Sequence, residues 1–347
     1  MGFLINPYNF AAGTVGGWVE LGRTTLGSSN STISVSSLAN KRYLQILGYI
    51  TGQSIADSIL TRVGKTTIDS GSTYAYRDST NGSADGTDVN QTSMPWMGAA
   101  LSTPRFINTF VSNYATKEKL FITHEISQNA IGAANTTSRT EQVNKWANTS
   151  NEIDICNFIA SSGTLNSGSE VVVLGWDPAA THTNNFWTEL ASVTTLTTGN
   201  VDSGTFTAKK YLWIQFELIV NAYDDTGVVI QFNADTAGNY TNRISQNGAG
   251  DGTNVSQTSI GTTISGGKRI FGNMFIINNS ANEKLVIGHT VVIGTTANST
   301  AEGAGVAPRR VEFVGKWANT ASQITKIVLD DTAANFVSGQ IKVWGSD

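Results

Sequence analysis

The sequence repeats itself, and this repeat constrains the fold more than any other feature. The matching pairs, in order along the chain, include Trp18–Leu21 with Trp187–Leu190, Lys41–Leu44 with Lys209–Leu212, Asn81–Ser93 with Asn247–Ser259, and Lys145–Thr149 with Lys316–Thr320. The third pair is identical at nine of thirteen positions. The order is collinear, and the spacing between partners drifts by only a few residues, as loop insertions in a shared fold produce. The chain is therefore predicted to contain two copies of one module.

The repeat predicts four parts along the chain. They are an N-terminal arm (1–17), copy one (18–177), a linker (178–186) and copy two (187–347). The linker is polar and begins at Pro178, which is typical of a segment between domains. Copy two ends at the chain terminus where copy one meets the linker, and this supports the boundary.

The composition favours strands over helices. Only 14% of the residues are charged, against about 25% in a typical soluble domain. Good helix formers such as Glu, Lys, Gln and Leu are scarce, whereas Thr, Ser, Asn and Gly are abundant. Apolar residues come in short dense runs and the net charge is only −4, which argues against disorder. We therefore expect an all-β protein with many polar turns.

Each copy is predicted to be an antiparallel β-sandwich. Alternating or β-branched runs such as 32–35, 43–50 and 211–220 are separated by turn residues. Asn81-Gly82 and Asn247-Gly248 have the chemistry of tight turns that need positive φ. Seven or eight strands in about 160 residues suit a two-sheet, jelly-roll-like sandwich, with a small closed barrel as the alternative.

Charge and cysteine content exclude several classes of function. The chain lacks the basic field that captures nucleic acid, so no direct nucleic-acid partner is expected. The start of the sequence lacks the features of a signal peptide, and no apolar run is long enough to span a membrane. The single cysteine, Cys156, lies in an apolar stretch and is predicted to pack as a small hydrophobic residue.

The repeated Asn-Gly-x-x-Asp-Gly segment is the main candidate for metal binding. Asp85 with Asp88, or Asp251 with Asn254, supplies the oxygen atoms that Ca²⁺ prefers. A calcium loop needs more carboxylates and a bidentate Glu, and none follows. A glycine-rich turn before a strand is therefore the favoured interpretation, and we expect no metal and no cofactor.

No set of residues predicts catalysis. His124 and His289 occupy equivalent positions and are interpreted as structural residues. Glu141 and Glu312 are equivalent acids beside Arg139 and Arg310, and a salt bridge or alternation on a strand explains them. A glycan-degrading enzyme would need clustered carboxylates, and both copies contain few. Trp146 and Trp317 follow a Lys and precede Ala-Asn-Thr, and we interpret them as core residues at a sheet corner rather than sugar-stacking platforms. The protein is expected not to be an enzyme.

Several segments of copy two resemble β-rich modules that recur in structural proteins of tailed bacteriophages. These segments are Phe232–Tyr240, Arg243 with the Asn-Gly-x-x-Asp turn, Glu283–His289, Ala307–Arg310, Gly315–Thr320 and Trp344–Asp347. The resemblance covers most of copy two and is fainter in copy one, where Arg62–Lys65 replaces the start of the first segment. It implies a location in the virion, as a capsid-associated, neck, tail or fibre protein, and it brings no catalytic residue.

We therefore expect a non-enzymatic virion structural protein that assembles with itself and with other virion proteins. Apolar side chains of the arm are candidate contacts to a neighbouring subunit, because such an arm rarely stays exposed in a monomer: Phe3, Leu4, Ile5, Tyr8 and Phe10. The alternative is a carbohydrate-binding module or host-receptor adhesin on a tail fibre. It would bind a host glycan through exposed aromatic residues such as Trp96, Trp176 and Trp187.

Overall fold

The chain forms two compact all-β units. The computed structural model describes residues 17–178, 184–193, 199–220, 227–262, 269–293, 303–331 and 336–347, and of residues 97–101 the backbone alone. Unit 1 comprises residues 1–127 and 140–187, and unit 2 comprises residues 128–139 and 188–347. The described part of the chain contains no helix, and so none that is long and apolar enough to cross a membrane.

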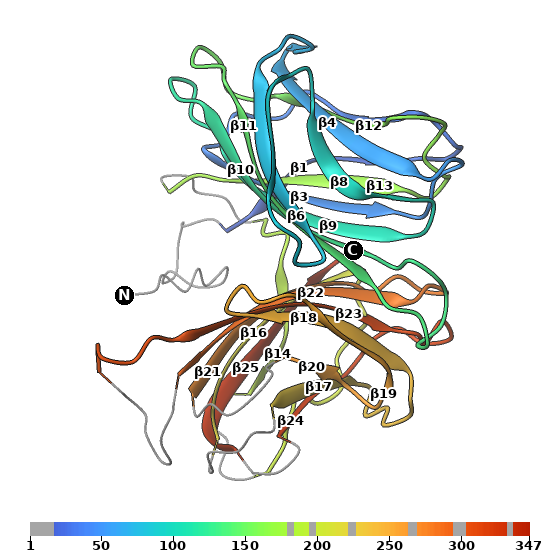
Figure 1. Ribbon diagram of the computed structural model, residues 1–347, viewed down its shortest axis with the longest axis vertical. Helices are drawn as coiled ribbons and strands as arrows, with labels where there is room; N and C mark the ends of the chain where they lie inside the picture. Colours follow the sequence, from blue (N-terminus) through green and yellow to red (C-terminus); the bar gives the residue numbers. More distant parts are fainter. Residues whose placement is uncertain are drawn as a thin grey trace. The chain divides into compact units, whose positions relative to one another are not determined.

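Unit 1 is a sandwich of two antiparallel sheets (Figure 1). The larger sheet contains, in spatial order, β1 (Val19–Thr25), β13 (Glu170–Trp176), β3 (Tyr43–Ile50), β9 (Arg105–Ser112), β10 (Lys119–Ser127), β11 (Ser138–Trp146), β6 (Tyr74–Thr80) and β7 (Gly86–Gln91). The smaller sheet contains β2 (Thr32–Val35), β12 (Ile155–Ala160), β4 (Asp57–Lys65) and β5 (Thr67–Ile68), with β8 (Met94–Leu101) paired to β4.

Unit 2 repeats this arrangement, except that no strand among its described residues corresponds to β5. Its larger sheet contains β14 (Thr188–Val193), β25 (Phe336–Ser346), β16 (Tyr211–Val220), β21 (Arg269–Ile277), β22 (Lys284–Ile293), β23 (Arg309–Trp317), β18 (Tyr240–Gln246) and β19 (Gly252–Gln257). Its smaller sheet contains β15 (Val201–Asp202), β24 (Ile327–Asp331), β17 (Val228–Phe232) and β20 (Ile260–Gly261). The equal strand orders confirm the tandem duplication and the prediction of two β-sandwiches.

The two sheets of each unit enclose its hydrophobic core. In unit 1, Ile46 of β3 and Ile107 of β9 meet Val63 of β4 and Phe158 of β12 in one buried cluster. Buried and partly exposed residues alternate along β12, so one face of this strand points into the core. Cys156 packs in this core as a small apolar residue, as predicted. Its burial raises the pKa of the thiol to about 12.

A tyrosine and a tryptophan fasten the two sheets together at the same place in both units. In unit 1, Tyr74 and Trp146 lie opposite each other on β6 and β11. The Tyr74 hydroxyl donates to the Val63 carbonyl of β4 at 2.9 Å, and the Trp146 Nε1 donates to Asp69 at 2.8 Å. Tyr240 and Trp317 of unit 2 repeat the pairing. Both tryptophans are buried, as the sequence predicts.

Two predictions from the sequence need correction. The strands are more numerous than the seven or eight expected per copy, because short edge strands such as β5, β7 and β15 carry no strong apolar pattern. The unit boundary falls after Trp187, and residues 128–139 belong to unit 2 although they lie within copy one of the sequence. The tight turns are as predicted, since Asn81-Gly82 and Asn247-Gly248 all have positive φ.

Candidate functional site

The aromatic residues proposed as a ligand platform do not form one. Trp96 is buried against Phe158, with ring centroids 4.0 Å apart. Trp187 is also buried, and its indole N–H lies 3.4 Å from the Gln45 side-chain oxygen. Trp176 is half-buried and stacks on Tyr43. The expectation that Trp96 and Trp187 face a ligand is therefore wrong, because unit 1 uses both indoles in its interior.

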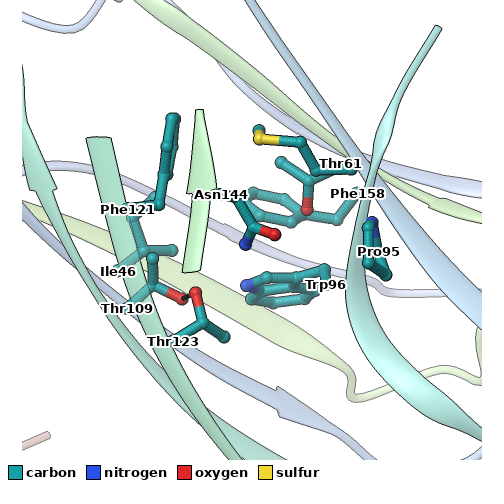
Figure 2. Close-up of a pocket in the computed structure, with 10 residues that line it drawn as sticks. Ile46, Thr61, Pro95, Trp96, Thr109, Phe121, Thr123, Asn144 and Phe158 are labelled. Carbon is teal, nitrogen blue, oxygen red and sulfur yellow. Dashed lines mark hydrogen bonds between the residues drawn. The ribbon is translucent and has the colours of Figure 1, made fainter. Parts of the chain in front are cut away.

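Trp96 lines a small cavity inside unit 1 that has three polar atoms in a mostly apolar lining. Figure 2 shows Thr61, Trp96 and Asn144 around this space, beside Thr109 and Thr123. The cavity volume is about 10 Å³, which is about the size needed for one water molecule. Thr61 Oγ1, Trp96 Nε1 and Asn144 Oδ1 have no hydrogen-bond partner in the described part of the chain. This space is suited to a single water molecule and is too small for a sugar ring.

The candidate contacts of the arm cannot be placed. Phe3, Leu4, Ile5, Tyr8 and Phe10 lie in residues 1–16, outside the described residues.

Asp251, a candidate metal ligand of copy two, binds an arginine side chain. Asp251 is almost fully buried, with a side chain 1% exposed, and accepts two hydrogen bonds from Arg139, at 2.7 and 3.3 Å. Arg139 also donates to Glu312 at 3.0 Å. A bidentate guanidinium–carboxylate pair of this kind is a strong, directional contact. The positive charge next to Asp251 is therefore supplied by the chain itself.

A second buried ion pair lies at the other end of the same segment. The Lys316 ammonium is 3.4 Å from the Glu283 carboxylate, and both side chains are buried. Lys316 also donates to the Ala130 carbonyl at 2.7 Å. Glu283 accepts 2.6 Å hydrogen bonds from Gln128 Nε2 and from the Gly132 backbone N–H. These contacts satisfy both charges, as burial of a charged pair requires.

Between the two ion pairs, backbone carbonyl groups of the segment accept further hydrogen bonds from unit 2. The Ala133 carbonyl accepts from the Thr241 hydroxyl and from the Ser256 backbone N–H at 2.9 Å. The Thr137 carbonyl accepts from Arg243 Nε at 2.8 Å. We call the residues of unit 2 that hold the segment 128–139 the docking site: Thr241, Arg243, Asp251, Ser256, Glu283, Glu312 and Lys316. The docking site binds this turn-containing segment through charge and main-chain hydrogen bonds.

The residues of the docking site can be named from the sequence, but the sequence does not predict that they come together. Arg139 and Arg310 are equivalent in the repeat, and so are the acidic residues Glu141 and Glu312. Local spacing pairs each arginine with the acidic residue two positions later, and Arg310 does contact Glu312 at 3.0 Å. Arg139 instead reaches Asp251, more than a hundred residues away, and no local pattern encodes such a contact.

A buried lysine beside the docking site makes unit 2 more stable as the pH rises above neutral. Lys284 is fully buried and donates to the carbonyl groups of Asn282 and Asn319 at 2.7 and 2.9 Å. Burial lowers the pKa of its ammonium group to about 8. The unfolded chain, with the ordinary lysine pKa, therefore binds more protons than the folded chain above pH 8, and stability rises with pH there.

We expect the free energy of unfolding of unit 2 to increase by about 1–2 kcal/mol between pH 7.5 and 9.5 because of Lys284. Urea unfolding of the wild-type chain and of Lys284→Met at both pH values measures this, and the comparison removes the contributions of other groups. The variant should lose most of the increase. Equal increases in the two proteins would show that Lys284 does not carry the effect.

Each unit also has an open hollow on its surface. One, of about 390 Å³ in unit 2, is lined by Val229, Asn242, Ile244, Gly252, Thr253, Asn254, Gln257, Ser259 and Gly261. The other, also about 390 Å³, lies in unit 1 and includes Lys65, Asp69 and Trp146. Trp146 is buried, so its ring face is not available for stacking. Neither hollow combines an exposed aromatic ring with convergent polar groups among the described residues.

Comparisons with known proteins provide no family. No protein-family model and no curated protein matches the chain. Among solved structures, domains LG4-5 of the mouse laminin alpha1 chain are 13% identical and cover 99% of this chain and 93% of their own, with a TM-score of 0.21. The botulinum neurotoxin serotype D/C VPI 5993 binding domain is 10% identical and covers 87% of each chain, with a TM-score of 0.15. At such TM-scores, these likenesses carry no argument about function, and the assignment of the fold rests on the strand pairing described above.

Proposed function

We propose that the protein is a non-enzymatic structural component of a tailed-bacteriophage virion and acts by self-assembly. The observation that carries the proposal is the docking site, in which a loop of one repeat is built into the sandwich of the other. Arg139 of the loop pairs with two buried carboxylates, and the buried pair Lys316–Glu283 binds the other end of the loop by hydrogen bonds. A module that binds the loop of a like module is suited to build larger assemblies from copies of itself. The resemblance of copy two to phage structural modules supports the virion location.

The surface chemistry supports the same proposal. Few charges are available to protect sheet edges against strand addition, since only 14% of the residues are charged. Proteins that work as isolated monomers rarely leave edges and apolar side chains unprotected. Here Leu120, Ile122 and Val143 are each more than half exposed on the outer face of β10 and β11. Neighbouring subunits would cover this face.

Sedimentation velocity and electron microscopy of the purified full-length chain test the proposal. We expect discrete oligomers or ordered particles whose fraction increases with protein concentration. A chain that remains monomeric at all concentrations would contradict self-assembly. Mass spectrometry of purified phage particles that carry the gene tests the virion location, and the absence of its peptides from them would contradict that location.

Glycan binding is the alternative function, and the hollow of unit 2 is the place for it. Asn242, Thr253, Asn254 and Gln257 offer amide and hydroxyl groups to an open space of about 390 Å³. Stacking aromatic rings, which sugar-binding sites use to gain affinity, are missing from its described lining. A glycan array with the full-length chain separates the two functions, because a purely structural subunit should bind no glycan.

A further inference from the structure

Copy one carries a counterpart of the docking site on its own surface. Repeat matching assigns its residues, which we call the counterpart site: Ala75, Arg77, Asp85, Asn90, Glu118, Glu141 and Lys145. The pair Arg77–Asp85 matches Arg243–Asp251 of the docking site. In unit 2 the side chains of Arg243 and Asp251 are 14% and 1% exposed. Their equivalents in unit 1, Arg77 and Asp85, are 54% and 50% exposed. The same charged residues are thus present in both units, but those of unit 1 are exposed to solvent.

The second ion pair shows the same contrast. Glu118 and Lys145 of unit 1 lie 3.1 Å apart and are 40% and 43% exposed. Their equivalents Glu283 and Lys316 are 2% and 0% exposed in unit 2. The counterpart site therefore keeps the groups that hold the two ends of the segment 128–139 in unit 2.

The backbone of the counterpart site already has the required conformation. Ser256, whose N–H binds the Ala133 carbonyl, has a φ of 49°, and its equivalent Asn90 has a φ of 54°. Both lie on edge strands, β19 and β7, that pair with a bulge to β18 and β6. The edge geometry that exposes this N–H is therefore present in both units.

Unit 2 carries a second, exposed copy of the segment that the docking site binds. Residues 303–310 match residues 132–139 in the repeat, and both begin with a glycine of positive φ, Gly303 at 67° and Gly132 at 92°. Both then form a turn, and two residues outside any turn or strand follow before the strand begins. Residues 303–308 are exposed, and the Arg310 side chain is 63% exposed, against 6% for Arg139.

We propose that the counterpart site of unit 1 binds residues 303–310 of a second copy of this chain. This inference rests on the proposed self-assembly and names its surface. Arg310 binds Asp85, as Arg139 binds Asp251. The Gly303 N–H donates to Glu118, and the Pro308 carbonyl accepts from Arg77. The Ala304 carbonyl accepts from the Asn90 N–H. The docking contacts with residues 132–139 are retained, except that Ala75 replaces Thr241 and removes one hydroxyl donor.

The outer face of β11 supplies an apolar centre for this contact. Val143 lies opposite Arg77 on β6, and Lys145 lies opposite Ala75. Val143 is 52% exposed, so it stands among the charged groups of the counterpart site. An apolar centre with a polar and charged rim is the usual composition of a protein–protein interface.

The contact makes assembly directional. Each chain offers a segment on unit 2 and a counterpart site on unit 1, so the two surfaces that meet are different. Such a heterologous contact joins chains head to tail, and it produces a closed ring or an open filament.

Charge reversal at each side of the contact tests the proposal with the full-length chain. Asp85→Arg disables the counterpart site, and Arg310→Glu disables the segment. Each variant alone should bind itself at least tenfold more weakly than the wild type in sedimentation velocity, because a like-charge pair replaces an ion pair. Arg269→Glu, which reverses an exposed arginine elsewhere on unit 2, should assemble like the wild type.

Mixing the two variants provides a sharper result. Arg310→Glu keeps the native counterpart site, Asp85→Arg keeps the native segment, and the two reversed charges attract each other. A one-to-one mixture should therefore regain assemblies in which the two variants alternate. The double variant, in which the two charges are exchanged, should regain larger assemblies. If both single variants assemble like the wild type, the docking of residues 303–310 is wrong while self-assembly stands. A wild-type chain that is always monomeric contradicts the proposed function itself.

Discussion

Replacing Arg139 with methionine is expected to lower the free energy of unfolding of unit 2 by about 3–5 kcal/mol. The guanidinium is 6% exposed and holds both Asp251 and Glu312, so its removal leaves two carboxylates in a buried site. A methionine fills much of the volume but offers no hydrogen bond and no charge. Urea or thermal unfolding of the full-length chain, followed by circular dichroism, measures the loss.

Arg310→Met is the matched control, because Arg310 occupies the same position in the repeat. Its side chain is 63% exposed and contacts only the rim of the same acidic cluster through Glu312. Exposed ion pairs contribute little, so we expect a change of about 0.5 kcal/mol or less. Similar losses in the two variants would mean that burial of Arg139 does not decide its contribution.

The second large effect is expected from Gly48→Ala in unit 1. A Cβ atom at this position would lie 2.1 Å from Cη2 of the buried Trp96 and 2.8 Å from Ile107. Both neighbours are core residues with little space to move, so the backbone or the indole must shift. Overpacking of this kind costs about 2–3 kcal/mol, which unfolding in urea at neutral pH measures. The indole fluorescence of Trp96 should change as well.

Gly27→Ala provides the comparison for Gly48→Ala within the same unit. A Cβ atom there would meet nothing within 4 Å, and residue 27 is exposed. We expect its effect on stability to stay within about 0.5 kcal/mol. Were Gly27→Ala as destabilising as Gly48→Ala, the contact with Trp96 would not be the cause.

Much of the fold could be predicted from the sequence because its signals are local or repeated. Apolar runs indicate strands, Asn81-Gly82 marks a tight turn, and the repeated Lys-Trp step places Trp146 and Trp317 in equivalent cores. The duplication predicts two sandwiches without knowledge of any contact. Each of these features depends on residues that are close in the chain or on a pattern that occurs twice.

The docking site could not be predicted in the same way. Arg139 and Arg310 are equivalent in sequence, yet one is buried in unit 2 and the other is exposed. Their different surroundings depend on which surface each loop meets, and that is a long-range property. The burial of Trp96 has a similar origin, because it follows from the absence of a side chain at Gly48, on a strand that is distant in sequence. The expectation that Trp96 is exposed is therefore wrong, because packing against Gly48 and Phe158 buries its indole.

The position of residues 128–139 also bears on how such a protein can evolve. The gene presents two tandem repeats, and recombination at the linker 178–186 would separate them. A second repeat inherited alone would lose Arg139 and leave Asp251 and Glu312 without their buried cation. Unit 2 thus contains a segment that the first repeat encodes, and a cut at the linker does not separate the two structural units.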